Sequence, residues 1–126
     1  MSFTNFLETE ILDHVFAGAA YSAPGTHYLG LFTSAPGETG GGTELSGSAY
    51  VRKSVAFTTS GNTTSNNAAI EFPTATGSWG TVTHVGVFDA SSSGNLMAYA
   101  TLSASKAIAT GDVFRVPSGD LDITLD

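Results

Sequence analysis

A single helical segment followed by many short strand-like segments is the pattern that most constrains this chain. Residues 2–17 carry apolar side chains at helical spacing. From residue 26 onward, short apolar runs alternate with clusters of Gly, Ser, Thr, Asn and Pro. The pattern predicts a β-rich body with one amphipathic helix at its amino-terminal end.

The predicted helix gathers most of its apolar side chains on one stripe. Ser2, Thr4 or Asn5 with Glu8 would cap its start, and Gly18 is a natural stop. Such a stripe either packs on the β body of the same chain or docks on another molecule. We take it as a candidate docking surface, made of Phe3, Phe6, Leu7, Ile11, His14 and Val15.

The rest of the chain contains about seven candidate strands. Apolar and polar residues alternate in several of them, as in strands with one buried and one wet face. Strands at this spacing predict a mainly β fold, an antiparallel β-sandwich or jelly-roll-like body over 26–126, within a single domain of residues 1–126. The candidate strands are 26–32, 50–58, 68–72, 81–89, 96–102, 113–116 and 121–125.

Two connections differ from the short turns elsewhere. Residues 33–49 form a long Gly-rich segment that contains Pro36 and three successive glycines, 40–42. Loops of this length are uncommon in compact domains, and they are usually functional or ordered by a partner. Residues 60–67 are a second, shorter polar segment, which we also expect to be a loop.

Charge and composition exclude several classes of function. The formal net charge is −7, and the four cations are scattered, so nucleic acid is not an expected partner. No apolar run approaches the roughly 20 residues that cross a bilayer, and the first residues do not resemble a signal peptide. With no cysteine, disulfides and thiolate metal sites are also excluded.

No group of residues shows the pattern of a catalytic site. Nucleophilic catalysis needs a base held beside a nucleophile and oriented by a third group, and no supporting motif surrounds any histidine. Paired carboxylates could hydrolyse glycosides, but the spacing of the acidic residues does not predict that two of them converge. We therefore predict that the chain is not an enzyme and needs no cofactor. The candidates considered are His14, His27, His84, Glu38, Glu44 and Glu71.

Two weaker possibilities concern a cation and a glycan. Acidic residues alternate near the carboxyl end, where they would either hold a cation or protect an edge strand from aggregation. The single tryptophan would either be a core or interface residue or stack on a sugar, with tyrosines as further platforms. The acids are Asp120, Asp122 and Asp126, and the aromatic residues are Trp79, Tyr28, Tyr50 and Tyr99. Of these aromatic residues, Trp79 is also a candidate interface residue, together with the six residues of the helix stripe.

The order of several motifs resembles a family of small virion proteins of tailed bacteriophages, of tail-fibre-like or decoration type. The helix at residues 5–15 is followed by Leu-Gly-Leu-Phe at 29–32 and Trp-Gly-Thr-Val-Thr-His at 79–84. Further resembling segments are residues 41–47, 50–57 and 86–90.

This resemblance implies a non-enzymatic structural protein of the virion that is assembled in the host cytoplasm. It would dock on capsid or tail proteins, as a head decoration or as a tail or fibre component, and self-associate as a homo-oligomer, with a trimer as one candidate. The alternative is a carbohydrate-binding β-sandwich module that recognises a glycan of the host surface.

Overall fold

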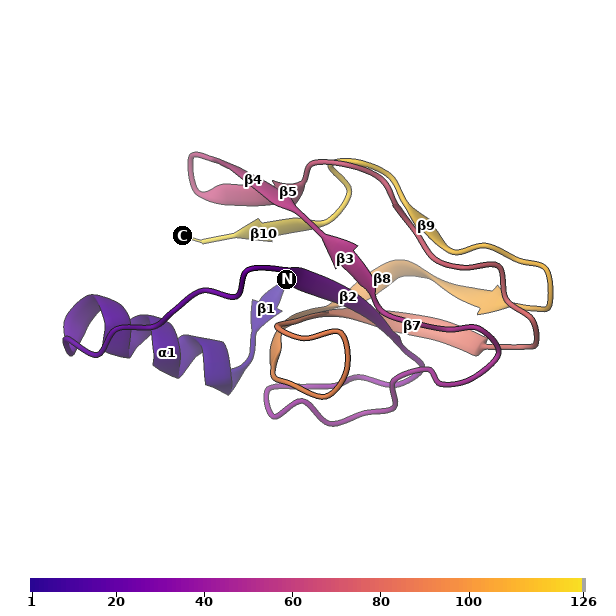
Figure 1. Ribbon diagram of the computed structural model, residues 1–126, viewed down its shortest axis with the longest axis horizontal. Helices are drawn as coiled ribbons and strands as arrows, with labels where there is room; N and C mark the ends of the chain where they lie inside the picture. Colours follow the sequence, from indigo (N-terminus) through magenta and orange to yellow (C-terminus); the bar gives the residue numbers. More distant parts are fainter. Residues whose placement is uncertain (126) are drawn as a thin grey trace.

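The computed structural model describes residues 1–125, and it is mainly β with antiparallel sheets and one N-terminal helix, as predicted (Figure 1). Asp126 lies outside the described residues. The elements, in order, are β1 (Ser2–Phe3), α1 (Asn5–Phe16), β2 (His27–Phe32), β3 (Lys53–Val55), β4 (Phe57–Ser60), β5 (Thr63–Asn66), β6 (Ile70–Glu71), β7 (Gly80–Phe88), β8 (Leu96–Ile108), β9 (Arg115–Val116) and β10 (Asp122–Thr124).

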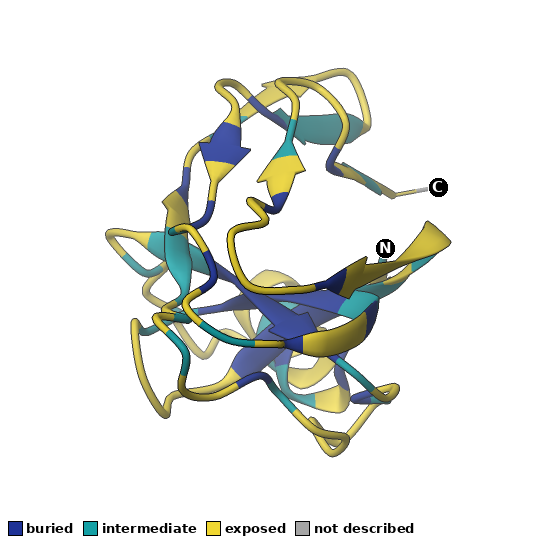
Figure 2. Cartoon of the chain, turned by 90° about the vertical axis from the view of Figure 1, so that its right-hand side faces the viewer, coloured by how far each residue is buried: buried dark blue, intermediate teal, exposed yellow. Residues whose placement is uncertain are grey.

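The largest sheet has five strands in the order β1-β8-β7-β2-β3, and all of its neighbouring strands are antiparallel. A three-stranded sheet has the order β10-β5-β4, and a two-stranded sheet pairs β6 with β9. The main core lies between one face of the five-stranded sheet and the smaller sheets. Figure 2 shows the buried residues concentrated along the large sheet.

The two faces of the large sheet carry different residues because side chains alternate along a strand. Leu29 faces Val87 and Leu31 faces Val85 on the side of the main core. On the opposite side, Gly30 faces Gly86 in the same register. A smaller apolar cluster of Phe32, Phe88 and Leu96 covers that second face, with Tyr28 and Tyr99 at its edge.

The long Gly-rich segment is ordered against its own chain. The Thr33 amide donates to the Thr43 carbonyl (2.9 Å) and the Leu45 amide donates to the Leu31 carbonyl (3.0 Å), so the segment folds back beside β2. Gly42 has a φ of +74°, and a Cβ there would lie 2.7 Å from the Ser34 and Ala35 carbonyl oxygens. Intramolecular contacts thus order this loop without a neighbouring chain.

Several predicted boundaries are wrong. Ser2 and Phe3 belong to β1 rather than to the helix, and the predicted strand 50–58 is split into β3 and β4. The polar segment 60–67, expected to be a loop, contains β5, and β8 continues six residues beyond the predicted end at Leu102. The physical reason is pairing across the sheet, which the local pattern does not record.

Candidate docking surface

The base of α1 is fixed to the large sheet. The N-cap is Thr4, a buried residue whose hydroxyl donates to the Leu96 carbonyl (2.6 Å) and accepts a long bond from the Leu7 amide (3.5 Å). The Asn5 amide donates to the Glu38 carbonyl (3.0 Å), which ties the helix to the Gly-rich loop. Leu7 is the one buried residue of the helix, so only its first turn is held by the body.

The far end of the helix is closed by a chain reversal. Gly18 has a φ of +74°, and the Ala19 amide donates to the Asp13 carbonyl (3.1 Å), which confirms Gly18 as the stop. The chain then returns along the helix, because the Tyr21 amide donates to Nδ1 of His14 (3.0 Å). The Tyr21 ring packs edge-on against Phe6 with 6.4 Å between centroids. Burial, followed by the nearby carboxylates, raises the pKa of Tyr21.

Three large apolar side chains on the distal half of α1 are exposed. Leu12 is 57%, Val15 60% and Phe16 80% exposed, and Figure 1 shows the helix projecting from one end of the molecule. With 3.6 residues per turn, Leu12 and Phe16 lie roughly 140–180° from Leu7, on the side of the helix opposite the sheet. We call Leu12, Val15 and Phe16 the distal patch.

The predicted stripe is divided between different environments. Leu7 is buried against the body, and Phe3 lies on β1. Phe6 and Ile11 are half-buried, and His14 and Val15 are exposed. Sequence reasoning missed Leu12 and Phe16, although their spacing of four residues is itself a helical signal.

Trp79 does not join this surface. It is 5% exposed, lies in the main core, and donates from its indole nitrogen to the Ser48 carbonyl (2.9 Å). Tyr50 packs edge-on against it with 5.6 Å between centroids, and the Tyr50 hydroxyl donates to Glu44 (2.7 Å). In this conformation the tryptophan is a core residue that holds the 48–50 turn.

The histidines have separate local roles. Besides His14, which accepts from Tyr21, His84 shares a hydrogen bond with the Thr83 hydroxyl (2.8 Å). His27 packs edge-on against Phe57, and burial lowers the pKa of His27. Within residues 1–125, these contacts do not bring the three histidines together around one nucleophile.

The acidic candidates also lie in separate places. Glu44 binds Arg52, Glu38 accepts from the Tyr99 hydroxyl (2.8 Å), and Glu71 is exposed on β6. The hydrogen bond to Glu38 raises the pKa of Tyr99. Asp122 accepts from the Ser65 hydroxyl, while Asp120 lies in the turn before β10 rather than on the strand. Across residues 1–125 there is no cluster of three or more His, Asp or Glu side chains placed to hold a metal ion.

No helix within the described part of the chain is long and apolar enough to span a membrane. The family model described as Podophage GP4 fiber I protein gp80 matches residues 2–124. A comparison with curated proteins gives no match.

Proposed function

The chain belongs to the family of the podophage GP4 fiber I protein gp80, a family of phage fibre structural proteins, and on that premise we propose that it is a non-enzymatic fibre component that joins the virion through the distal half of α1. This family confirms the resemblance to tail-fibre-like virion proteins. Assembly in the host cytoplasm and self-association belong to the same proposal.

The distal patch is the observation that supports this role. Surface apolar residues are normal when scattered singly, but Leu12, Val15 and Phe16 are clustered on one short helix that the body holds only by its first turn. Full burial of an exposed side chain of this kind is favourable by about 1.5–3 kcal/mol, and the partly buried Leu12 and Val15 would gain a smaller amount. A structural protein that must be captured by other chains needs a surface of this kind.

The exposed remainder of the chain fits a structural role. Charged residues make up 12% of the sequence, about half the usual share. The β4–β5 hairpin and β10 present hydroxyl groups, with Thr63 bonded to Thr124 (3.0 Å) and Thr59 to Thr64 (3.0 Å). A neutral, hydroxyl-rich surface of this kind loses little charge solvation when neighbouring subunits cover it.

Glycan recognition is the weaker candidate. A ring that stacks on a sugar must offer an open face, whereas Trp79 is buried and Tyr50 lies stacked on Phe72 with 6.2 Å between centroids. Tyr28 and Tyr99 are half-buried at the edge of the second apolar cluster. The distal patch favours protein docking over sugar binding.

The proposal is tested by incorporation into particles. A phage that carries Leu12→Ser together with Phe16→Ser should yield particles that lack the protein, while the purified variant unfolds at the wild-type temperature. Val51→Ser with Val113→Ser is the matched control, since both residues are exposed apolar side chains outside α1. Normal incorporation of the helix variant would remove the docking role from α1.

A further inference from the structure

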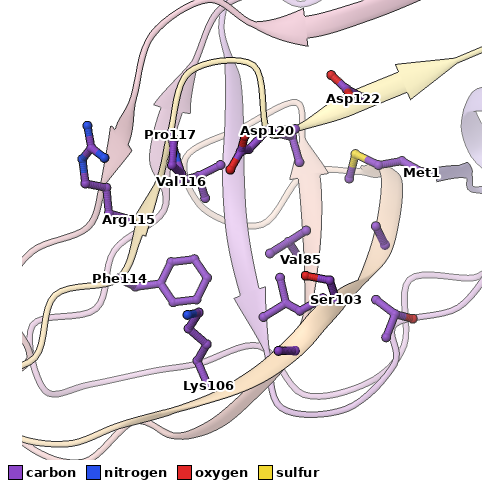
Figure 3. Close-up of a pocket in the computed structure, with 15 residues that line it drawn as sticks. Met1, Val85, Ser103, Lys106, Phe114, Arg115, Val116, Pro117, Asp120 and Asp122 are labelled. Atoms are coloured by element: carbon purple, nitrogen blue, oxygen red, sulfur yellow. The ribbon is translucent and has the colours of Figure 1, made fainter.

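A groove lies beside the core, between β8 and the segment that contains β9. It has a volume of about 370 Å³, and Figure 3 shows side chains of both segments pointing toward it. Its apolar lining includes Met1, Val85 of β7, Leu102 of β8, Phe114, Val116 and Leu121. We call this hollow the β8–β9 groove.

Charged side chains also line the β8–β9 groove. Lys106 comes from β8, Arg115 from β9 and Asp122 from β10, with Asp120 in the turn between β9 and β10 (Figure 3). Within residues 1–125, the ion pair between Arg52 and Glu44 is the only one, so three cations lack a carboxylate partner there. Two of those three, in a chain of net charge −7, line this groove.

The distal patch has the complementary properties. Leu12, Val15 and Phe16 are spaced as i, i+3 and i+4, which is how a short helix places apolar anchors in a groove. The helix also carries Glu8, Glu10 and Asp13 and contains neither Lys nor Arg. Its acidic side chains therefore have favourable partners in Lys106 and Arg115, while Asp120 and Asp122 disfavour docking poses that bring those side chains close to them.

From this match we infer that the distal half of α1 of one copy docks in the β8–β9 groove of a second copy. The inference rests on the proposed function, because it names the partner of the same helix surface. The helix cannot reach the groove of its own chain. The pairing of β1 with β8 directs α1 toward the opposite end of the molecule from β9 (Figure 1). Each copy then gives one helix and accepts one.

This arrangement is tested first with variants of the two surfaces. Phe16→Ser removes an anchor, and Ser103→Trp fills the groove at an exposed position of its lining. The matched controls are Val51→Ser and Ser105→Trp, of which Ser105 is exposed on the same strand but outside the groove lining. Sedimentation should show an oligomer for the wild type and both controls, and monomers for Phe16→Ser and for Ser103→Trp.

Mixing the two variants identifies the contact. The Ser103→Trp copy retains a functional helix and the Phe16→Ser copy retains an open groove, so an equimolar mixture should form 1:1 pairs with one intact contact. A double variant, Phe16→Cys with Ser103→Cys, should form disulfides between copies, and the result is unambiguous because the chain has no cysteine of its own. Phe16→Cys with Ser91→Cys, an exposed position away from the groove, should not.

Several results would overturn the inference. Oligomers of Ser103→Trp would indicate that helices bundle with one another, and oligomers of Phe16→Ser would indicate pairing through another surface, such as the edge of β8. A wild type that sediments as a monomer at every concentration would exclude self-docking. If particles lack the Phe16→Ser variant but contain the Ser103→Trp variant, the docking role of α1 stands and its partner is a different virion protein.

Discussion

The guanidinium carbon of Arg52 lies 3.4 Å from the centroid of the Phe88 ring. The same guanidinium binds both carboxylate oxygens of Glu44 (2.8 Å each) and donates to the Ala90 and Ser93 carbonyls (2.9 and 2.8 Å). One side chain therefore joins the end of the Gly-rich loop, the second face of the large sheet and the β7–β8 connection. The Arg52 side chain is 8% exposed, so water screens these contacts little.

Replacing this arginine should destabilise the fold. Arg52→Ala leaves Glu44 without its partner and should lower the free energy of unfolding by about 2–4 kcal/mol. Arg52→Lys should recover only part of the loss, because an ammonium cannot bind the carboxylate with two parallel bonds. Urea unfolding measures both, with the exposed Ser92→Ala as a control expected within about 0.5 kcal/mol of wild type. A wild-type midpoint for Arg52→Ala would contradict this role.

The facing glycines of β2 and β7 leave room for the aromatic side chains of the second apolar cluster. A Cβ at Gly86 would lie 2.5 Å from Leu96 Cδ1 and 3.0 Å from Phe32 Cε1, and one at Gly30 would lie 2.7 Å from Phe88 Cε2. Gly86→Ala should therefore lower the free energy of unfolding by about 1–3 kcal/mol.

Gly25→Ala is the matched control, since a Cβ there meets nothing within 4 Å and its backbone is outside the left-handed region. It should leave stability unchanged or raise it by up to about 1 kcal/mol. Thermal unfolding of the two alanine variants side by side makes the comparison, and equal stability would contradict the close packing at Gly86.

The turn whose Ser48 carbonyl accepts the hydrogen bond of Trp79 is strained. Ser48 and Ala49 have φ values of 52° and 71°, in the left-handed region that favours glycine. Ala49→Gly should raise the free energy of unfolding by about 0.5–1 kcal/mol, the relieved strain less the added chain entropy. Ala69→Gly, at an exposed residue without positive φ, should instead lower it by about 0.5–1 kcal/mol. Denaturant titrations measure both variants. A change of the free energy of unfolding in the same direction for both would contradict backbone strain at Ala49.

Burial of one histidine predicts a pH dependence. Desolvation lowers the pKa of His27, although the charge of Asp89 opposes the shift. Between the folded-state pKa and the unfolded value of about 6.5, the unfolded chain binds more protons, so stability is lost as pH falls through this window. His27→Gln should flatten the rise in stability from pH 5 to pH 7. Urea unfolding at several pH values measures this slope, and a wild-type slope for His27→Gln would contradict the prediction.

Features that depend on local sequence were predictable. The helix, its stop at Gly18 and the strand at residues 27–32 each follow from periodicity and turn chemistry over a few residues. β5 was not predictable in this way, because Thr63–Asn66 contains only polar residues. Its last residue, Asn66, is 1% exposed and donates to the Ala68 and Pro117 carbonyls (2.9 and 3.0 Å), contacts that only the folded chain provides.

The candidate docking surface was predictable in part. Apolar spacing indicated a helix with a free stripe, but only the pairing of β1 with β8 determines which side of α1 faces the body. Leu12 and Phe16 become the exposed side as a consequence. The β8–β9 groove was not predictable, because it joins Met1, residues of β8 and residues after position 113, far apart in the sequence.

The pairing of β1 with β8 also sets the order of events during synthesis. Ser2 pairs with Tyr99 and Phe3 with Ala98, so residues 2 and 3 find their strand partners only after residue 99 has been synthesised. Contacts this distant in sequence form late, because a long loop must close first. Until then α1 has no fixed base on the sheet. Under the docking role proposed for α1, a chain can therefore present the helix to its partner only after it has completed its fold.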